Sequence, residues 1–296
     1  MKLRPYQDEA ADFLYERDRA MILAPVGAGK TAITLTAMQD MLANGVVKRF
    51  LVLAPKRVCT DVWPIEQPKW APDVPLAVAV GTPKERAAAL RSKAQIVVSN
   101  YDNIQWLAEQ ALNFDGIVFD ELTRLKNPSG TRFKSLLKII DPMVVRWGLT
   151  GSFTSNGLED VFGQCKIVDQ SLLGRSKGAF MQQYFVLINK EFGEWAPRVG
   201  ALANVMARIK PATYVLEAGD YADKLPPLHV VKTSCAMDMA DYKAMKKNFM
   251  VQFPDTQAVA ANAGVVTAKL QQMASGFVYA EGKETKWISD HKFQVL

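Results

Sequence analysis

Two short stretches of this 296-residue sequence combine glycine, lysine, hydroxyl and carboxylate groups in patterns that suit phosphate chemistry. The first is APVGAGKT at residues 24–31. Gly27 and Gly29 have no Cβ, so the backbone there can wrap around phosphate oxygens with its N–H groups pointing inward. Lys30 can reach the β- and γ-phosphates, and the Thr31 hydroxyl can bind Mg²⁺. The stretch therefore predicts a loop that binds the phosphates of a nucleotide.

One position departs from the full pattern of such loops, because Ala24 stands where a glycine is expected. The added methyl group costs little if the φ angle of Ala24 is negative. The alternative interpretation is a glycine-containing turn followed by a solvated lysine. The flanking segments favour the phosphate loop, since residues 20–25 form a short apolar strand candidate and residues 31–45 have the pattern of a helix closed by Asn44 and Gly45.

The second stretch, residues 114–121, is an apolar run that ends in two adjacent carboxylates. At the end of a parallel strand, Asp120 and Glu121 would lie at the carboxyl edge of the sheet, where open α/β folds bind their ligands. Asp120 could hold Mg²⁺ through its water shell, and Glu121 could orient or deprotonate the attacking water. Taken alone, the pair could equally be exposed acids at a strand end. Together with the phosphate loop, it predicts hydrolysis of a nucleoside triphosphate.

The segments that must position these residues follow an alternating pattern. Short apolar runs, typical of buried strands, are separated by stretches with helical spacing, which predicts an α/β protein with a mostly parallel, doubly wound sheet. After about residue 158 the alternation gives way to a long stretch that is compatible with helices. Pro226 and Pro227 then indicate a boundary. The apolar runs lie at 20–25, 49–55, 75–81, 94–100, 115–121 and 144–152.

The composition excludes several classes of protein. Hydrophobic residues make up 49% and charged residues 22%, as in an ordinary globular protein, and no apolar run approaches the ~18–20 residues of a membrane span. Cys59, Cys165 and Cys235 match no metal pattern and indicate thiols of a reducing cytoplasm. With only His229 and His291 present, a histidine-based catalytic site is not expected. The net charge of +6 favours anionic partners, although solvated charged faces would explain it equally well.

The motifs together resemble those of superfamily two helicases, and among them the SNF-type translocases of double-stranded DNA. LRPYQ at residues 3–7 is similar to the adenine-recognition motif of that family, and APVGAGKT is similar to its phosphate loop, which often has alanine at the position of Ala24. The resemblance implies a RecA-like P-loop NTPase lobe that uses ATP and Mg²⁺. It assigns nucleotide binding to Arg4, Gln7, Gly27, Ala28, Gly29, Lys30 and Thr31, Mg²⁺ to Thr31 and Asp120, and catalysis to Lys30, Asp120 and Glu121.

Three further stretches resemble other motifs of the family. Residues 51–70 resemble a strand followed by a nucleic-acid-contacting loop, and residues 96–104 resemble the motif that comes next. Residues 118–132 are close to the acidic motif of the family, with Leu122 and Thr123 in place of the usual Ala-His pair. The resemblance implies contacts to the backbone of double-stranded DNA without sequence specificity. For any single basic residue, the alternative is an ordinary solvated charge. The residues it assigns to nucleic-acid binding are Lys56, Arg57, Asn100, Tyr101, Arg124 and Lys126, with Arg132 and Lys134 in the same basic cluster.

A last motif, RWGLTGSFTSN at residues 146–156, resembles the one that couples the ATP state to DNA movement. Phe153 stands where the family usually has proline, which puts the strength of this coupling in question. The coupling residues implied by the resemblance are Thr150, Gly151, Ser152 and Asn156.

Three tryptophans lie among charged residues and could be taken for platforms on which bases stack. Because duplex translocases grip the backbone and not unstacked bases, we interpret them as core or loop packing. These tryptophans are Trp63, Trp70 and Trp106.

The sequence thus predicts a RecA-like ATP-binding lobe at 1–158, a helical protrusion or insertion at 159–225, and a linker with the opening elements of a truncated second lobe at 226–296. We find no match to the arginines that complete the ATP site of the family. We therefore expect a weakly active DNA-dependent ATPase that needs a second RecA-like lobe, in cis or on a partner chain, and works in the cytoplasm of a bacterial or phage system. Two alternatives stay open, a nucleotide-gated DNA-binding module that does not move and the motor part of a restriction or repair nuclease complex.

Overall fold

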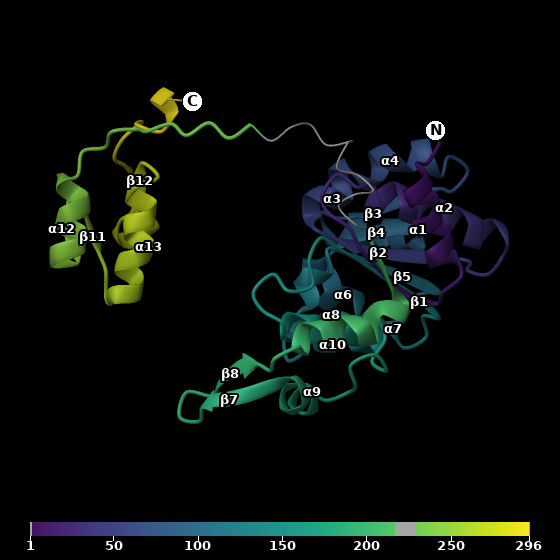
Figure 1. The fold of residues 1–296 in the computed structure, drawn as a ribbon. Coiled ribbons are helices and arrows are strands. Elements are labelled where there is room, and N and C mark those ends of the chain that lie inside the picture. Colours follow the sequence, from purple (N-terminus) through teal and green to yellow (C-terminus); the bar gives the residue numbers. More distant parts are fainter. Residues whose placement is uncertain (1, 217–228, 296) are drawn as a thin grey trace. The chain divides into compact units, whose positions relative to one another are not determined.

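The computed structural model describes residues 2–216 and 229–295, which Figure 1 shows as a ribbon. The chain divides into two compact units, Met1–Pro226 and Pro227–Leu296. Two hydrophobic clusters form the core of the first unit, and a third cluster forms the core of the second. Both motifs that suit phosphate chemistry lie in the first unit.

A seven-stranded sheet forms the centre of the first unit, and all of its neighbouring strands pair in parallel. The strand order is β3-β4-β2-β5-β6-β1-β9, so the chain crosses over the sheet between strands as it does in doubly wound folds. The predicted α/β class is confirmed. The strands are β1 (Arg19–Leu23), β2 (Phe50–Ala54), β3 (Leu76–Ala79), β4 (Ile96–Asn100), β5 (Gly116–Asp120), β6 (Val145–Thr150) and β9 (Thr213–Val215).

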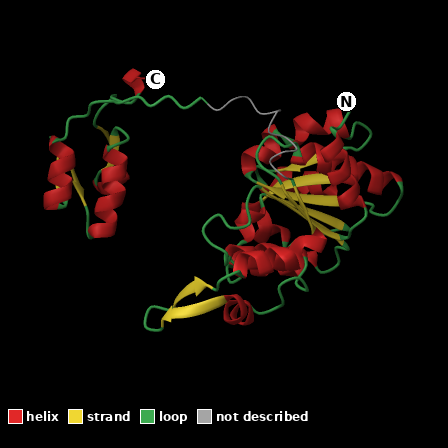
Figure 2. Ribbon diagram, in the orientation of Figure 1, coloured by secondary structure: helices red, strands yellow, loops and turns green. Residues whose placement is uncertain are grey.

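Helices cover both faces of this sheet (Figure 2). Phe50 and Val52 of β2 belong to the cluster that includes α1–α4, whereas Leu51 and Leu53 belong to the cluster that includes α6–α10. Burial on both faces explains why the strands read as continuous apolar runs. The helices are α1 (Pro5–Tyr15), α2 (Lys30–Ala43), α3 (Lys56–Asp61), α4 (Trp63–Trp70), α5 (Pro83–Arg91), α6 (Ile104–Leu107), α7 (Thr131–Ile140), α8 (Asp160–Val168), α9 (Lys177–Tyr184) and α10 (Ala201–Ile209).

The segment after β6 contains strands as well as the expected helices. β7 (Phe185–Asn189) and β8 (Glu194–Pro197) form an antiparallel hairpin that extends away from the sheet (Figure 1), and β9 adds the seventh strand beside β1. The sequence pattern did not indicate these strands, because β9 has only three residues and consecutive side chains of β7 are exposed. Since β9 joins the central sheet, the end of this segment belongs to the lobe.

The second unit is a small α/β module with a core of its own. Its two antiparallel pairs are β10 (Met250–Gln252) with β11 (Gln257–Val259), and β12 (Phe277–Tyr279) with β13 (Thr285–Trp287). Its helices are α12 (Ala240–Asn248) and α13 (Ala263–Met273), and its buried residues include Met245, Val251, Ala258, Val266, Met273 and Val278.

The three cysteines are free thiols in different surroundings. Cys59 and Cys165 are buried, whereas Cys235 is partly exposed. Burial raises the pKa of the Cys59 thiol to about 12 and also raises the pKa of Cys165. Within the described ranges, the structure has no helix with the length and apolar character of a membrane span.

Candidate functional site

The loop between β1 and α2 has the backbone shape that its glycines predict. Gly27 and Gly29 both have φ angles of 85°, in the left-handed region that favours glycine. A Cβ at Gly29 would overlap the side-chain amide of Gln7. Ala24 is not among the residues with positive φ, so its methyl group is accommodated, and its N–H donates a 3.0 Å hydrogen bond to the Thr150 carbonyl. The loop therefore keeps its shape without a third glycine.

Lys30 turns its ammonium group back over this loop. Its Nζ donates hydrogen bonds of 2.8 Å to the Ala24 carbonyl and 2.9 Å to the Pro25 carbonyl. Burial lowers the pKa of Lys30, while the negative charges of Asp120 and Glu121 act in the opposite direction. The ammonium group is thus held between the loop and the two carboxylates of the acidic motif, where an anion in the loop would meet it.

Gln7 connects the start of α1 to the same loop. Its Nε2 donates a 3.0 Å hydrogen bond to the Ala28 carbonyl, and its Oε1 accepts one of 3.0 Å from the Arg4 backbone N–H. Gln7 is only 8% exposed, and Arg4 is exposed beside it. The structure therefore places Gln7 of the predicted adenine-recognition motif next to the phosphate loop, whereas Arg4 contacts Gln7 through its backbone N–H and does not line the cavity there.

A cavity of about 520 Å³ brings the sequence-distant residues together. The Thr31 and Asp120 side chains line it with the phosphate loop, and their hydroxyl and carboxylate oxygens are the ligand types that Mg²⁺ prefers. In the part of the chain that the structure describes, no three His, Cys, Asp or Glu residues cluster as a metal site, so Mg²⁺ here would rely on one carboxylate, one hydroxyl and nucleotide oxygens. The lining residues are Gln7, Val26, Gly27, Gly29, Lys30, Thr31, Ala32, Val58, Val62, Glu66, Trp70 and Asp120.

Asp120 is held from two neighbouring elements. Its Oδ2 accepts a 3.0 Å hydrogen bond from Nε1 of Trp63, and its backbone carbonyl accepts one of 2.8 Å from the Tyr101 hydroxyl. Burial raises the pKa of Asp120, while the Trp63 hydrogen bond and the charge of Lys30 oppose this shift. Both aromatic side chains are thus polar supports of the acidic motif, a role that their sequence positions did not reveal.

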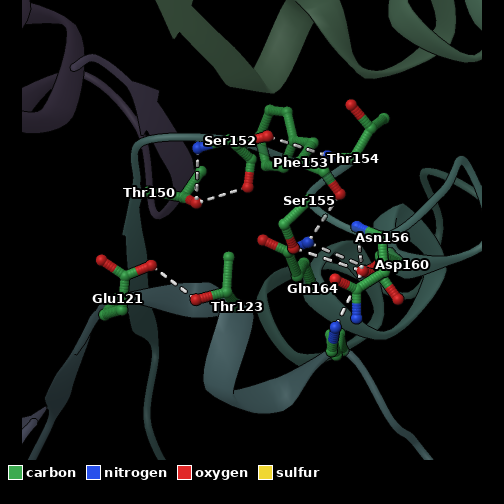
Figure 3. A network of polar contacts seen from close by, with 11 residues as sticks. Glu121, Thr123, Thr150, Ser152, Phe153, Thr154, Ser155, Asn156, Asp160 and Gln164 are labelled. Carbon is green, nitrogen blue, oxygen red and sulfur yellow. Dashed lines mark hydrogen bonds and ion pairs between the residues drawn. The ribbon is translucent and has the colours of Figure 1, made fainter. Parts of the chain in front are cut away.

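Glu121 has an unusual backbone conformation. Its φ angle is 67°, and its Oε1 accepts a 2.5 Å hydrogen bond from the Thr123 hydroxyl. Figure 3 shows this pair beside the loop that starts at Thr150. Thr123, which stands where histidine is usual in the resembling family, is therefore the direct partner of the predicted general base.

The predicted coupling loop is fastened to α8 by Asp160, a residue that the sequence analysis missed (Figure 3). Asp160 Oδ2 accepts hydrogen bonds from the Asn156 backbone N–H at 3.1 Å and the Ser155 hydroxyl at 3.3 Å. It also forms a 3.0 Å ion pair with Lys126, whose side chain is 30% exposed. Lys126 thus joins the turn after Glu121 to the coupling loop.

The start of the coupling loop has its own supports. The Thr150 hydroxyl donates a 2.8 Å hydrogen bond to the Ser152 carbonyl, and Gly151 and Ser152 line a second cavity of about 410 Å³. Phe153 is buried in the hydrophobic core, and its carbonyl accepts a 2.9 Å hydrogen bond from Gln164 of α8. The side chain that replaces the usual proline therefore anchors the loop through packing.

Five of the six predicted nucleic-acid contacts fall into two groups, and the sixth, Lys126, is the ion-pair partner of Asp160. Lys56, Arg57 and Arg124 are exposed after strand ends at the carboxyl edge of the sheet. Asn100 and Tyr101 are buried, with exposed fractions of 6% and 4%, and their polar atoms bond within the protein. The first three side chains are thus accessible to a surface ligand. Asn100 and Tyr101 point inward, where their polar groups support neighbouring loops.

A family model and a phage relative both match almost the whole chain. A family model described as the SNF2-related domain matches residues 6–284. A putative protein of Acyrthosiphon pisum secondary endosymbiont phage 1 is 36% identical over 313 residues, which cover 99% of this chain and 68% of that protein. An uncharacterized ATP-dependent helicase of Mycoplasma genitalium is 30% identical over 185 residues, which cover 59% of this chain and 18% of that protein.

Solved structures show the same fold. The Sulfolobus solfataricus SWI2/SNF2 ATPase core in complex with dsDNA matches with a TM-score of 0.63 and 23% identity, over 75% of this chain and 46% of that chain. The ATPase core domain of the same organism matches with a TM-score of 0.59 and 23% identity, over 84% and 51%. The chain therefore spans about half the length of these cores. The predicted RecA-like fold is confirmed.

Proposed function

We propose that this chain, which belongs to the SNF2-related domain family, is the first RecA-like lobe of an ATP-driven motor that moves along double-stranded DNA. The membership confirms the resemblance inferred from the motifs and makes the chain a helicase-like ATPase domain. The observation that carries the proposal is the cavity in which Gln7, the phosphate loop and Asp120 meet.

ATP would bind with its phosphates in the loop and its base near Gln7. The backbone N–H groups around Gly27 and Gly29 and the positive end of α2 favour negative charge at this point. Lys30 would exchange its hydrogen bonds to loop carbonyls for hydrogen bonds to phosphate oxygens. Because the loop carbonyls and the bound phosphates would lie at the same loop, this exchange would require only a rearrangement of the Lys30 side chain.

Hydrolysis would use Glu121 as the base that orients and deprotonates water. Mg²⁺ held by Thr31 and Asp120 would neutralise charge on the phosphates. Phosphoryl transfer also needs positive charge near the γ-phosphate, and among the residues that the structure describes Lys30 is the one cation that lines this cavity. We infer that a second lobe, on the same chain or another, supplies arginines there, and that residues 226–296 lead towards it.

DNA would contact the exposed cations at the carboxyl edge of the sheet. Lys56, Arg57 and Arg124 present positive charge on exposed side chains. Contacts of this kind position a duplex through its phosphates and carry no base specificity. The dsDNA in the complex of the Sulfolobus core supports this choice of partner. The phage relative supports a setting in the cytoplasm of a bacterial cell.

The decisive experiment measures ATP hydrolysis with and without duplex DNA, for residues 1–296 alone and for the same residues joined to a second lobe. We expect weak turnover from the chain alone and turnover about 10³-fold or more higher for the two-lobe protein, by analogy with arginine fingers. Nucleotide-dependent DNA binding without DNA-stimulated turnover would identify a passive module instead. DNA cleavage by the two-lobe protein would favour a nuclease-linked motor.

A further inference from the structure

Trp63 lies at the start of α4 and is fully buried, 57 positions before the acidic residue that it contacts. Its indole N–H donates to Oδ2 of Asp120 across 3.0 Å. A buried tryptophan needs a partner for this N–H, and a backbone carbonyl is sufficient. Trp147, which is equally buried, uses the Arg17 carbonyl at 2.9 Å. Trp63 instead uses a carboxylate that lines the nucleotide cavity.

The contact restricts how Asp120 presents its carboxylate. One oxygen is occupied by the indole, and the Tyr101 hydroxyl holds the backbone carbonyl of the same residue. The side chain of Asp120 is therefore held from α4, and its main chain is held from the turn that follows β4. Such supports set the orientation of a metal-binding carboxylate and the affinity of the site for its ion.

We propose that Trp63 is a positioning residue of the Mg²⁺ site, which holds the Asp120 carboxylate so that its second oxygen serves the water shell of the ion. The inference rests on the proposed ATP site. Trp63 itself is buried behind the cavity and does not line it, so it acts through Asp120 and touches neither nucleotide nor ion.

The test is a Mg²⁺ titration of the binding of a fluorescent ATP analogue to the chain, with Trp63→Phe and Trp147→Phe as a matched pair. Each change keeps an aromatic ring in the core and removes one buried N–H hydrogen bond of nearly the same length. For Trp63→Phe we expect the Mg²⁺ concentration at half-maximal binding to rise by about 10- to 100-fold, while binding in excess EDTA is unchanged. For Trp147→Phe we expect the parental midpoint.

Equal midpoints for Trp63→Phe and the parent would overturn the inference, as would an equal rise in both variants. If the parent itself binds the analogue without any Mg²⁺ dependence, the proposed ATP site fails instead, so the two failures are distinguishable. If Trp63→Phe does not fold, the NMR signals of the indole N–H groups in the parental protein provide the test instead. Mg²⁺ added to the ATP-bound chain must shift the Trp63 resonance and leave that of Trp147 in place, and an unmoved Trp63 resonance contradicts the proposal.

Discussion

The Thr123 hydroxyl donates a 2.5 Å hydrogen bond to Oε1 of Glu121, the residue that follows the last position of β5. Glu121 is one of two non-glycine residues with a positive φ in the described ranges, and such a conformation costs about 1–3 kcal/mol. Backbone and side chain of the proposed base are therefore both constrained. A strained residue directly after Asp120, which lines the cavity of the phosphate loop, points to a functional reason for its geometry.

Thr123→Val should lower kcat for ATP in the two-lobe protein by about 10- to 100-fold with little change in KM, because a misplaced base slows the chemical step more than binding. The variant keeps the branched shape and removes the hydroxyl. Thr123→Ser, which retains the hydroxyl, should restore most of the rate. Steady-state kinetics of the three proteins would refute this role for Thr123 if the valine variant matched the parent.

Glu121→Gln should keep binding of ATP and Mg²⁺ and reduce turnover by about 10²-fold or more, since the amide is nearly isosteric but cannot accept the proton of water. Binding is measured by titration with a fluorescent ATP analogue, and turnover by phosphate release from the two-lobe protein. A variant that keeps more than about a tenth of the parental rate would assign the base to another residue.

Lys30→Ala should remove most nucleotide binding and change the free energy of unfolding by about 1 kcal/mol or less, because the lost hydrogen bonds go to loop carbonyls that line an open cavity and can turn to water. Lys48→Ala is the control, since Lys48 is exposed just before β2, at the opposite edge of the sheet. Nucleotide titration and thermal unfolding of both variants separate binding from stability. Parental affinity in Lys30→Ala would exclude the loop as the phosphate site.

Reversal of the charges of Lys56 and Arg57 should weaken DNA binding and flatten its salt dependence. If each cation contacts one phosphate, the slope of log K against log salt should become shallower by about two. Charge reversal of Arg91 and Lys93 is a control with the same change in net charge. Both residues are exposed just before β4, at the amino edge of the sheet, opposite the carboxyl edge that carries Lys56 and Arg57. An equal loss in both double variants would indicate only a general effect of net charge.

Gly163→Ala should destabilise the first unit although it lies inside a helix, where alanine is normally preferred. Its new Cβ would overlap the backbone carbonyls of Leu125 and Lys126, so α8 must move away from the turn after Glu121. We expect a loss of about 1–3 kcal/mol in the free energy of unfolding. Gly178→Ala in α9, where the Cβ would meet only Ser176 Oγ at 3.6 Å, should be neutral or slightly stabilising. Denaturant unfolding of the two variants compares them directly.

Local patterns were sufficient for the parts of the site that depend on local backbone. Two glycines at the right spacing predict the left-handed angles of the phosphate loop, and an apolar run before Asp120 predicts its place at the sheet edge. Both follow from steric rules that act within a few residues.

The supporting contacts could not be predicted in this way, because each joins residues that are distant in the sequence. Nothing local distinguishes Trp63, which bonds to Asp120, from a tryptophan that only packs. In the sequence, Lys126 looks like an ordinary surface lysine, but in the structure it forms an ion pair with Asp160 of α8. Asn100 and Tyr101 were assigned to DNA by motif, yet the fold turns their polar groups inward. In each case tertiary packing decides which partner a polar side chain finds.

The unequal burial of the cysteines should make this chain react with maleimide dyes at one thiol in preference to the other two. Thiolate is the nucleophile in that reaction, and the raised pKa and burial of Cys59 and Cys165 keep both sulfurs protonated and out of reach. Cys235, partly exposed in the second unit, should take up one fluorophore without any change to the core. A second fluorophore at Lys48→Cys would place a donor–acceptor pair across the two units. Energy transfer would then report, molecule by molecule, whether they change their separation when nucleotide binds.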